Sequence, residues 1–410
     1  MGKRNILIVC HYAQQPPYNT MLRYHNWGKE LVQRGDTVTI IAASTIHNTD
    51  FDIVEKLGKT EDSCDGVLYR YIRTPKYRGN GMQRIKNMLA FCTGLRQFKA
   101  LKPDIIIGCE AYLFPFIKFC FKNIPVITDT VDLWPESIIE YANYSKTNPI
   151  IKILYRLERN AYVNSDALVF SMEGGEEYLK EQSYSGKIDY RKVFHINMGC
   201  DIGTCDRYLK EHTEIPAWDF SKFNIVYCGS IRQANQVLQI CEAAKELLTQ
   251  GVNTVEFQIY GNGDELESLK RFVEENHVIN VHFHGRFQKE MIPCLLSYAR
   301  ASLLTYKQVD LMKYGGSQSK LFDYLAGGRP IICNAKWGYN LIERYHCGIV
   351  TEAQTPGAFA KAIMNLLHLS EGEIEQMGKN GRKAAEMYDQ PILVDTLCDV
   401  FSLVLDQKRG

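Results

Sequence analysis

Short apolar runs alternate with amphipathic helical stretches along the whole sequence, and this alternation restricts the fold more than any other feature. Many runs are almost continuously apolar, as in Asp104–Gly108, which is typical of strands buried on both faces of a parallel sheet. Neighbouring parallel strands need a right-handed crossover, usually through a helix. The sequence therefore predicts an α/β fold with two doubly wound, Rossmann-like domains. The expected strands are Asn5–Cys10, Thr37–Ala43, Val67–Ile72, Asp104–Gly108, Val126–Asp129, Ala167–Ser171, Val193–Asn197, Asn224–Cys228, Glu256–Tyr260, Val281–His284, Ala301–Thr305, Pro330–Cys333 and Gly348–Thr351.

The pattern of strands and helices is interrupted between Ile202 and Phe223. This interruption predicts a first domain over residues 1–202 and a second over residues 203–390. A last helix at about 391–410 is expected to pack back on the first domain. Ligands of doubly wound sheets bind outside the carboxyl ends of the strands, so we expect the site in a cleft between the domains.

Composition excludes several classes of protein. With 48 basic and 47 acidic residues the net charge is +1, which gives no general attraction to nucleic acid. The thirteen cysteines are scattered without a Cys-x-x-Cys pair, and the histidines have no spacing typical of metal ligands, so we expect no metal and free thiols in a reducing cytoplasm. No apolar run approaches the roughly 20 residues of a membrane span, and Gly2–Arg4 leads directly into a strand without a signal peptide.

The segment Tyr314–Ile332 is the strongest candidate for a binding site. A Gly-Gly-Ser loop that ends at Ser317 precedes a helix expected to open at Ser319 and to stop at Gly327 and Gly328. Free N–H groups and the helix dipole favour a phosphate at such a helix start.

Two charged residues of that helix fit the same ligand. Lys320 and Asp323 are three residues apart and share one helix face, so a cation suited to a diphosphate precedes a carboxylate suited to ribose hydroxyls. In the alternative interpretation Ser319 is an N-cap, Lys320 is solvated, and Asp323 compensates the dipole.

The loop after the first strand of the second domain carries Gly229, Ser230 and Arg232. Gly229 allows a ligand to approach the backbone, Ser230 can donate to a phosphate oxygen, and Arg232 can bind one with a fork of two hydrogen bonds. A tight turn between strand and helix explains Gly229 equally well.

Two further loops in the second domain give weaker signals. Gly261 and Gly263 follow another strand, where a turn is the first explanation and close approach to a substrate the second. Arg286 follows the next strand and is a candidate to flank a nucleobase.

The first domain contains Asp132, Trp134 and Glu136 just after a strand. The indole offers a flat face to a sugar ring, and the carboxylates can bind hydroxyls. The alternative is a helix start with Pro135 in its first turn and acids on the dipole. Residues Tyr77–Lys102 form a basic amphipathic stretch, which suits either an anionic membrane surface or an ordinary surface helix.

These motifs resemble glycosyltransferase family 4, the retaining transferases of the GT-B fold, and within it the bacterial surface-polysaccharide branch that serves capsule and O-antigen. The resemblance covers nearly the whole chain and includes the basic stretch after residues 77–81. It rests on five segments in the family's order: 132–137, 197–201, 229–232, 260–263 and 319–330.

The resemblance implies an acceptor-binding first domain and a nucleotide-sugar-binding second domain that face each other across a cleft. It implies that Asp323 holds the ribose and that N–H groups from Ser319 to Leu321 bind the diphosphate.

The chain departs from the family in three places. Gly315 replaces a sugar-contacting Glu, Val131 replaces a His of many members, and His11–Tyr18 replaces the usual glycine-rich loop. The donor sugar and any acceptor-side catalytic group therefore stay open.

The prediction is a retaining glycosyltransferase that moves a sugar from a nucleoside diphosphate, most simply UDP and including N-acetylated hexosamines, onto a lipid-linked saccharide. Arg232 and Lys320 would stabilise the leaving diphosphate without a metal or cofactor. The enzyme would be cytoplasmic and peripheral on the inner face of the cell membrane. Two alternatives remain: a nonhydrolysing UDP-sugar 2-epimerase, and a non-catalytic nucleotide-sugar-binding partner in polysaccharide assembly.

Overall fold

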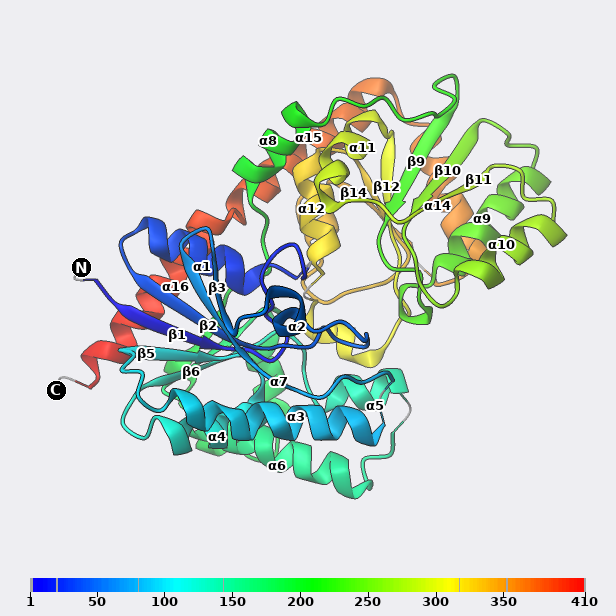
Figure 1. Cartoon of the computed structure of the whole chain (residues 1–410). Helices are drawn as coiled ribbons and strands as arrows, with labels where there is room; N and C mark the ends of the chain where they lie inside the picture. The colour runs from blue at the N-terminus through cyan, green and yellow to red at the C-terminus, as the bar shows by residue number, and fades with distance from the viewer. Residues whose placement is uncertain are drawn as a thin grey trace. The chain divides into compact units, whose positions relative to one another are not determined.

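The computed structural model describes residues 3–19, 21–79, 81–142, 144–316, 318–351 and 353–408. The chain forms two compact units (Figure 1). The first unit comprises the residues up to Asn197 together with those from Gln390 onward, and the second comprises Met198–Asp389. The sequence placed the division between residues 202 and 203, whereas the units divide between Asn197 and Met198. Both units contain a mainly parallel sheet, which confirms the predicted two-domain α/β fold.

The first unit is built on an eight-stranded sheet, counted over the described residues. Its order is β3-β4-β2-β1-β5-β6-β7-β8, and only the edge strand β3 runs antiparallel, pairing with β4. The strand order reverses between β1 and β5, which creates a crevice at their carboxyl ends. The strands are β1 Asn5–Val9, β2 Thr37–Ala43, β3 Glu61–Cys64, β4 Val67–Ile72, β5 Ile105–Gly108, β6 Val126–Thr130, β7 Ala167–Phe170 and β8 Val193–His195.

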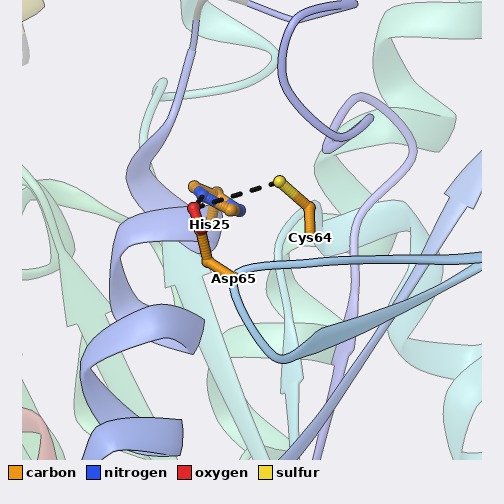
Figure 2. Close-up of side chains that lie close together, drawn as sticks. All are labelled: His25, Cys64 and Asp65. Atoms are coloured by element: carbon orange, nitrogen blue, oxygen red, sulfur yellow. Dashed lines mark hydrogen bonds and ion pairs between the residues drawn. The ribbon is translucent and has the colours of Figure 1, made fainter.

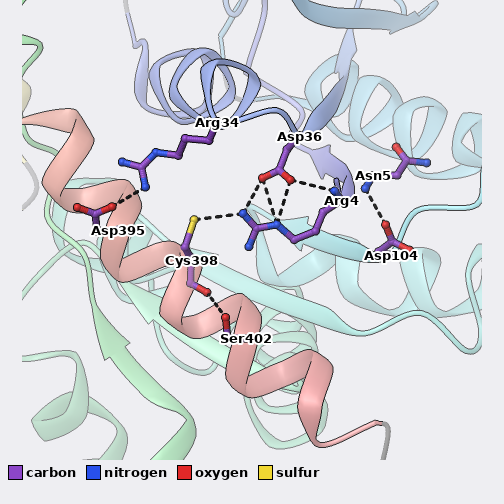
Figure 3. A network of polar contacts seen from close by, with 8 residues as sticks. All are labelled: Arg4, Asn5, Arg34, Asp36, Asp104, Asp395, Cys398 and Ser402. Atoms are coloured by element: carbon purple, nitrogen blue, oxygen red, sulfur yellow. Dashed lines mark hydrogen bonds and ion pairs between the residues drawn. The ribbon is translucent and has the colours of Figure 1, made fainter. Parts of the chain in front are cut away.

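Helices cover both faces of this sheet, with α1 and α16 on one side and α3, α4 and α6 on the other (Figure 1). The last helix, α16, packs on α1, and polar contacts tie it to the start of the chain (Figure 3). Arg4 forms a 2.6 Å ion pair with Asp36 and donates to Cys398 Sγ at 3.3 Å, and Arg34 pairs with Asp395. The α-helices are α1 Arg23–Gln33, α2 Ile53–Leu57, α3 Met82–Gly94, α4 Phe114–Cys120, α5 Glu136–Ala142, α6 Pro149–Asn164, α7 Gly175–Glu181 and α16 Gln390–Asp406.

The second unit has a six-stranded, fully parallel sheet in the order β11-β10-β9-β12-β13-β14, again counted over the described part of the chain. In chain order this is 3-2-1-4-5-6, the arrangement of a dinucleotide-binding fold, with the reversal between β9 and β12. The strands are β9 Phe223–Cys228, β10 Val255–Tyr260, β11 Val281–Gly285, β12 Ala301–Leu304, β13 Ile331–Cys333 and β14 Gly348–Val350.

The helices of the second unit pack in two groups, α9 with α10 and α14, and α12 with α8, α11 and α15. The expected interruption between Ile202 and Phe223 begins with a helix instead, Ile202–Glu211. Asp201 caps α8, because its carboxylate accepts a hydrogen bond from Thr204 N at 2.8 Å. The α-helices are α8 Ile202–Glu211, α9 Val237–Thr249, α10 Leu266–Glu275, α11 Ile292–Tyr298, α12 Ser319–Gly327, α13 Leu341–Arg344, α14 Pro356–Leu367 and α15 Glu371–Met387.

No helix in the described parts of the chain combines the length and apolar character needed to span a bilayer.

Candidate functional site

The start of α12 lies against the carboxyl end of β9, beside the reversal of strand order in the second unit. The buried Tyr324 fixes this position, because its hydroxyl accepts from Cys228 N at 2.9 Å and donates to Cys228 O at 3.3 Å. Lys320 lies one turn earlier on the same helix face. A helix start is thus held where doubly wound sheets bind their ligands.

Lys320 lies between two tyrosine rings. Its ammonium is 4.5 Å from the ring centre of Tyr306 and 4.9 Å from that of Tyr227. It donates to the Tyr227 hydroxyl at 3.2 Å and to Asn235 Oδ1 at 3.3 Å. Since Asn235 also donates to Ser230 Oγ at 2.7 Å, the loop after β9 and the start of α12 form one hydrogen-bonded cluster.

The charge of Lys320 is not balanced by an acid, since no carboxylate forms an ion pair with it among the described residues. Burial lowers the pKa of this lysine to about 7. An anion bound beside the ammonium would restore the charged form. The cluster therefore has the chemistry of an anion site that is completed by its ligand.

The N-terminus of α12 offers hydrogen-bond donors to the same region. Within the described chain, the backbone N–H groups of Ser319 and Lys320 have no acceptor, whereas Leu321 N donates to Gln318 O at 3.2 Å. Ser319 is exposed and Leu321 is buried, and the helix N-cap is Gln318 rather than Ser319. Ser317 lies outside the described residues.

Asp323 is one turn further along α12, with its side chain 19% exposed. Burial raises the pKa of this carboxyl, and the ammonium of Lys289, 3.7 Å from Oδ2, opposes the rise. Asp323 and Lys320 lie on the same helix but have different surroundings. Asp323 pairs with the ammonium of Lys289, whereas Lys320 lies between two aromatic rings.

The glycines after β9 and β10 pack two loops against each other. A Cβ on Gly261 would lie 1.8 Å from Gly229 O, and one on Gly263 would lie 1.9 Å from Ile231 O. Hydrogen bonds of 2.9 Å join Gly229 N to Tyr260 O and Ile231 N to Asn262 O. The need for glycine at 261 and 263 is thus explained by the contact between loops. Gly229 differs, because a Cβ there would meet the Lys320 side chain at 2.9 Å.

The other residues that were predicted to bind the nucleotide-sugar lie at the surface. Ser230 is exposed, and its hydroxyl accepts the hydrogen bond from Asn235. Arg232 is exposed, and its guanidinium has no hydrogen bond or ion pair within the described part of the chain. Arg286 is exposed after Gly285, which has a φ of 73°. The Arg232 guanidinium, two residues after Ser230, is therefore available to bind an anion.

The first unit has a pocket of its own at its reversal of strand order. It is a cavity of about 140 Å³ at the carboxyl ends of β1, β5 and β6. Glu110, two residues beyond β5, lies in its wall. Burial raises the pKa of Glu110 to about 7, although the carboxylate accepts from His11 N at 3.3 Å and Cys10 Sγ at 3.5 Å. Five of the other lining residues are aromatic: Tyr12, Tyr24, Tyr112, Trp134 and Tyr162.

The predicted acceptor residues divide between this pocket and its surroundings. Asp132 and Trp134 line it, and Trp134 lies 5.9 Å from the Tyr112 ring and 5.7 Å from the Arg84 guanidinium. Glu136 is not among the lining residues, because its carboxylate accepts from Tyr155 at 2.6 Å and pairs with Lys146 at 3.3 Å. The pocket combines flat apolar rings with carboxylates, a combination that suits a sugar ring.

Sequence reasoning missed several residues at these sites, namely Tyr227, Asn235, Tyr306, Lys289 and Glu110. Of these, only Glu110 could have been predicted from the sequence, because it is a carboxylate just after the strand 104–108. The tyrosines resemble ordinary strand residues in the sequence, and their role depends on where Lys320 lies.

Comparison with protein-family models matches residues 222–369 to "Glycosyl transferases group 1". No curated protein matches the chain by sequence. The match covers the strands and helices that carry the Lys320 cluster.

Solved glycosyltransferase structures resemble the whole chain. Sucrose-phosphate synthase from Thermosynechococcus elongatus has a TM-score of 0.78 at 13% identity, over 99% of this chain and 100% of that one. HepE from Anabaena, solved with UDP and glucose, has a TM-score of 0.68 at 12% identity, over 97% and 99%. WaaG, a glycosyltransferase of lipopolysaccharide biosynthesis, has a TM-score of 0.66 at 14% identity, over 96% and 99%.

At these identities the structural likeness shows the fold, which is GT-B as expected, whereas the family match bears on activity. Family 4 and the capsule and O-antigen branch are finer assignments than these findings reach. Residues 222–369 match the glycosyl transferases group 1 model, and the chain has the GT-B fold of solved glycosyltransferases.

Proposed function

We propose that the protein is a retaining glycosyltransferase that moves a sugar from a nucleoside diphosphate, taken as UDP, onto a lipid-linked saccharide in polysaccharide synthesis. The observation that carries the proposal is Lys320, a half-buried lysine without a carboxylate partner among the described residues. It is held beside a helix start at the strand-order reversal of the second unit. An anion suits this arrangement because it would balance the ammonium and accept from the helix start.

A diphosphate fits the donors around Lys320. The ammonium, the backbone N–H groups of Ser319 and Lys320 and the Arg232 guanidinium would stabilise the charge that develops on the leaving diphosphate. Asp323 would hold the ribose hydroxyls in this assignment. HepE, which shares the fold, has been solved with UDP-glucose, and this supports a nucleotide of the same kind here.

Retention of configuration would follow from attack on the leaving-group face of the sugar. The acceptor hydroxyl forms the new bond to the anomeric carbon while the bond to the diphosphate oxygen breaks, and a phosphate oxygen takes the hydroxyl proton. Because the protein's own cations balance the diphosphate, turnover should not require a divalent metal. Loss of activity in EDTA would count against this step.

The acceptor sugar is assigned to the pocket of the first unit. Trp134 and the tyrosines would stack on a sugar ring, and Asp132 and Glu110 would accept hydrogen bonds from its hydroxyls. The proposed role of Glu136 is reduced to positioning, since its carboxylate is held by Tyr155 and Lys146.

A lipid-linked acceptor is supported by the exposed face of α3. Met82 is 66% exposed and Leu89 is 54% exposed, and they lie on one stripe of α3 with Lys86. Phe119, which is 49% exposed, lies beneath the charged groups of Arg96 and Lys99. Apolar side chains ringed by cations are typical of a peripheral membrane surface.

Transfer from a set of UDP-sugars, with lipid-linked saccharides in anionic vesicles as acceptors, tests the proposal. Sugar phosphates in solution form the matched acceptor set. Label that moves to the lipid with retained anomeric configuration supports the proposal. Transfer only to soluble acceptors, or an inverted product, would refute the acceptor or the mechanism respectively.

A further inference from the structure

Three side chains with metal-binding atoms meet in the first unit, outside its pocket. They are His25 on α1, Cys64 at the end of β3 and Asp65 in the turn that follows (Figure 2). One imidazole nitrogen, one sulfur and one carboxylate oxygen lie within 4.8 Å of one another. This is the only group of this kind among the described residues.

The imidazole is already oriented toward the other two side chains. His25 Nδ1 lies 2.8 Å from the Tyr69 hydroxyl, and Nε2 lies 3.0 Å from Asp65 Oδ2. The His25 side chain is 7% exposed, so it has little freedom to turn away. A hydrogen bond to the second ring nitrogen is the usual way in which proteins orient a metal-binding histidine.

The hairpin that carries Cys64 and Asp65 is packed on α1 independently of this contact. Asp65 and Gly66 have φ values of 49° and 79°, as a two-residue hairpin turn requires. A Cβ on Gly66 would lie 2.7 Å from Val32, and one on Gly28 would lie 2.9 Å from Val67. These close contacts between α1 and the hairpin fix the three side chains before any ligand binds.

We propose that His25, Cys64 and Asp65 bind one Zn²⁺ ion, with water in the fourth position. Zinc bonds of about 2.0–2.3 Å to N, O and S at tetrahedral angles place neighbouring ligand atoms about 3.3–3.6 Å apart. The two contacts now measure 3.0 Å, from His25 Nε2 to Asp65 Oδ2, and 3.9 Å, from Cys64 Sγ to Asp65 Oδ2. The third distance, between the ligand atoms of His25 and Cys64, is within 4.8 Å, so these two atoms must approach each other by up to about 1.3 Å when the ion binds.

The donor set selects the metal class. A thiolate with an imidazole favours Zn²⁺ over Mg²⁺ or Ca²⁺, which prefer oxygen ligands. Burial and the carboxylates of Asp65 and Asp62 raise the pKa of the Cys64 thiol, so this proton must leave when the metal binds. The ion would join the edge strand β3 to α1, a structural role that does not depend on the proposed transferase chemistry.

The test uses the full chain without a polyhistidine tag, stripped with a chelator and then titrated with Zn²⁺ or Co²⁺. We expect one equivalent of zinc, a higher melting temperature in zinc, and a thiolate-to-cobalt charge-transfer band in the near ultraviolet. Cys64→Ser should remove the band and weaken zinc binding at least tenfold. Asp65→Asn tests the turn ligand, and asparagine tolerates the positive φ there.

Cys120→Ser is the matched control, because Cys120 is another partly exposed free thiol of the same unit outside the cluster. This variant should keep the cobalt band and the zinc affinity. A wild-type protein without the band, or a band that survives Cys64→Ser, would overturn the proposal. If Cys64→Ser does not fold, unchanged zinc affinity in Asp65→Asn, which lies on an exposed turn, overturns it in the same way.

Discussion

The charge state of Lys320 makes a quantitative prediction about donor binding. Burial between Tyr227 and Tyr306 lowers the pKa of the free ammonium to about 7, and no acid balances it within the described chain. A bound diphosphate favours the charged form and so raises this pKa. Binding should then take up a proton above pH 7, and affinity should be greatest below pH 7 and decline as the pH rises.

The size of the decline follows from linkage. If only the protonated lysine binds, the apparent dissociation constant grows by the factor 1 + 10^(pH − 7), which is about 30 at pH 8.5. Removing the charge altogether should cost what a hydrogen bond to a charged group contributes, about 1.5–3 kcal/mol. Lys320→Met is therefore expected to bind roughly 10- to 150-fold more weakly at pH 6, with little further change up to pH 8.5.

Isothermal titration with UDP-glucose between pH 6 and pH 8.5 measures this effect. A nucleotide sugar is the better ligand, because its phosphates are diesters that do not titrate in this range, whereas the terminal phosphate of UDP does. Repeating the titration in buffers of different ionisation enthalpy counts the protons taken up. Lys320→Arg is the control, since guanidinium stays charged and should give a nearly flat profile.

Two results would refute the reasoning. One is a wild-type affinity that changes less than threefold over the whole pH range. The other is a Lys320→Arg variant with the same slope as the wild type, which would assign the titration to another group.

Three further predictions concern other parts of the molecule. Gly261→Ala should lower the free energy of unfolding by at least about 2 kcal/mol, because its Cβ would lie 1.8 Å from Gly229 O. Gly357→Ala in α14, with open space around it, should not lower it in the same urea titration. Burial raises the pKa of Glu110 from 4.5 to about 7, so this carboxyl ionises at lower pH in the unfolded chain than in the folded one. The free energy of unfolding of the wild type should therefore fall by about 2–3 kcal/mol between pH 5 and pH 8. Glu110→Gln should not show this fall, and equal pH dependence of both proteins would contradict the assignment. Leu89→Glu should reduce binding to anionic vesicles in a sedimentation assay. Gln83→Glu, exposed on the same helix about a quarter of a turn from the stripe, should reduce it less. An equal loss of binding in both variants would show that net charge, and not the apolar Leu89 side chain, determines binding.

The strands of the fold were predictable because most of them are central and apolar. Every strand expected from the sequence is present, and Thr37–Ala43 and Val67–Ile72 agree at both ends. The missed strand, Glu61–Cys64, is polar and lies at the sheet edge, where side chains need not be apolar. Helix α8 was missed for a different reason: its glycine and polar residues resemble a linker, and only the Asp201 cap indicates a helix start.

The candidate site was predictable only where local sequence carries the chemistry. The start and end of α12 follow from Ser319 and from the glycines 327 and 328, and the structure places them as expected. The tyrosines around Lys320 and the partner of Asp323 come from other strands and loops, so their sequence spacing contains no signal. Glu136 shows the opposite failure, because a plausible motif residue is taken up by Tyr155 and Lys146.

The last helix also determines the order in which the protein can be completed during synthesis. The second unit is one continuous segment, Met198–Asp389, but the first unit needs both the residues up to Asn197 and those from Gln390 onward. While the ribosome translates the second unit, the apolar side chains of Leu393, Leu397 and Phe401 do not yet exist to cover their part of the first unit's core. Domains made first usually fold first, whereas here the first unit can be completed only after the second has been made. The residues up to Asn197 must therefore wait, partly uncovered, while the ribosome makes the second unit, Met198–Asp389.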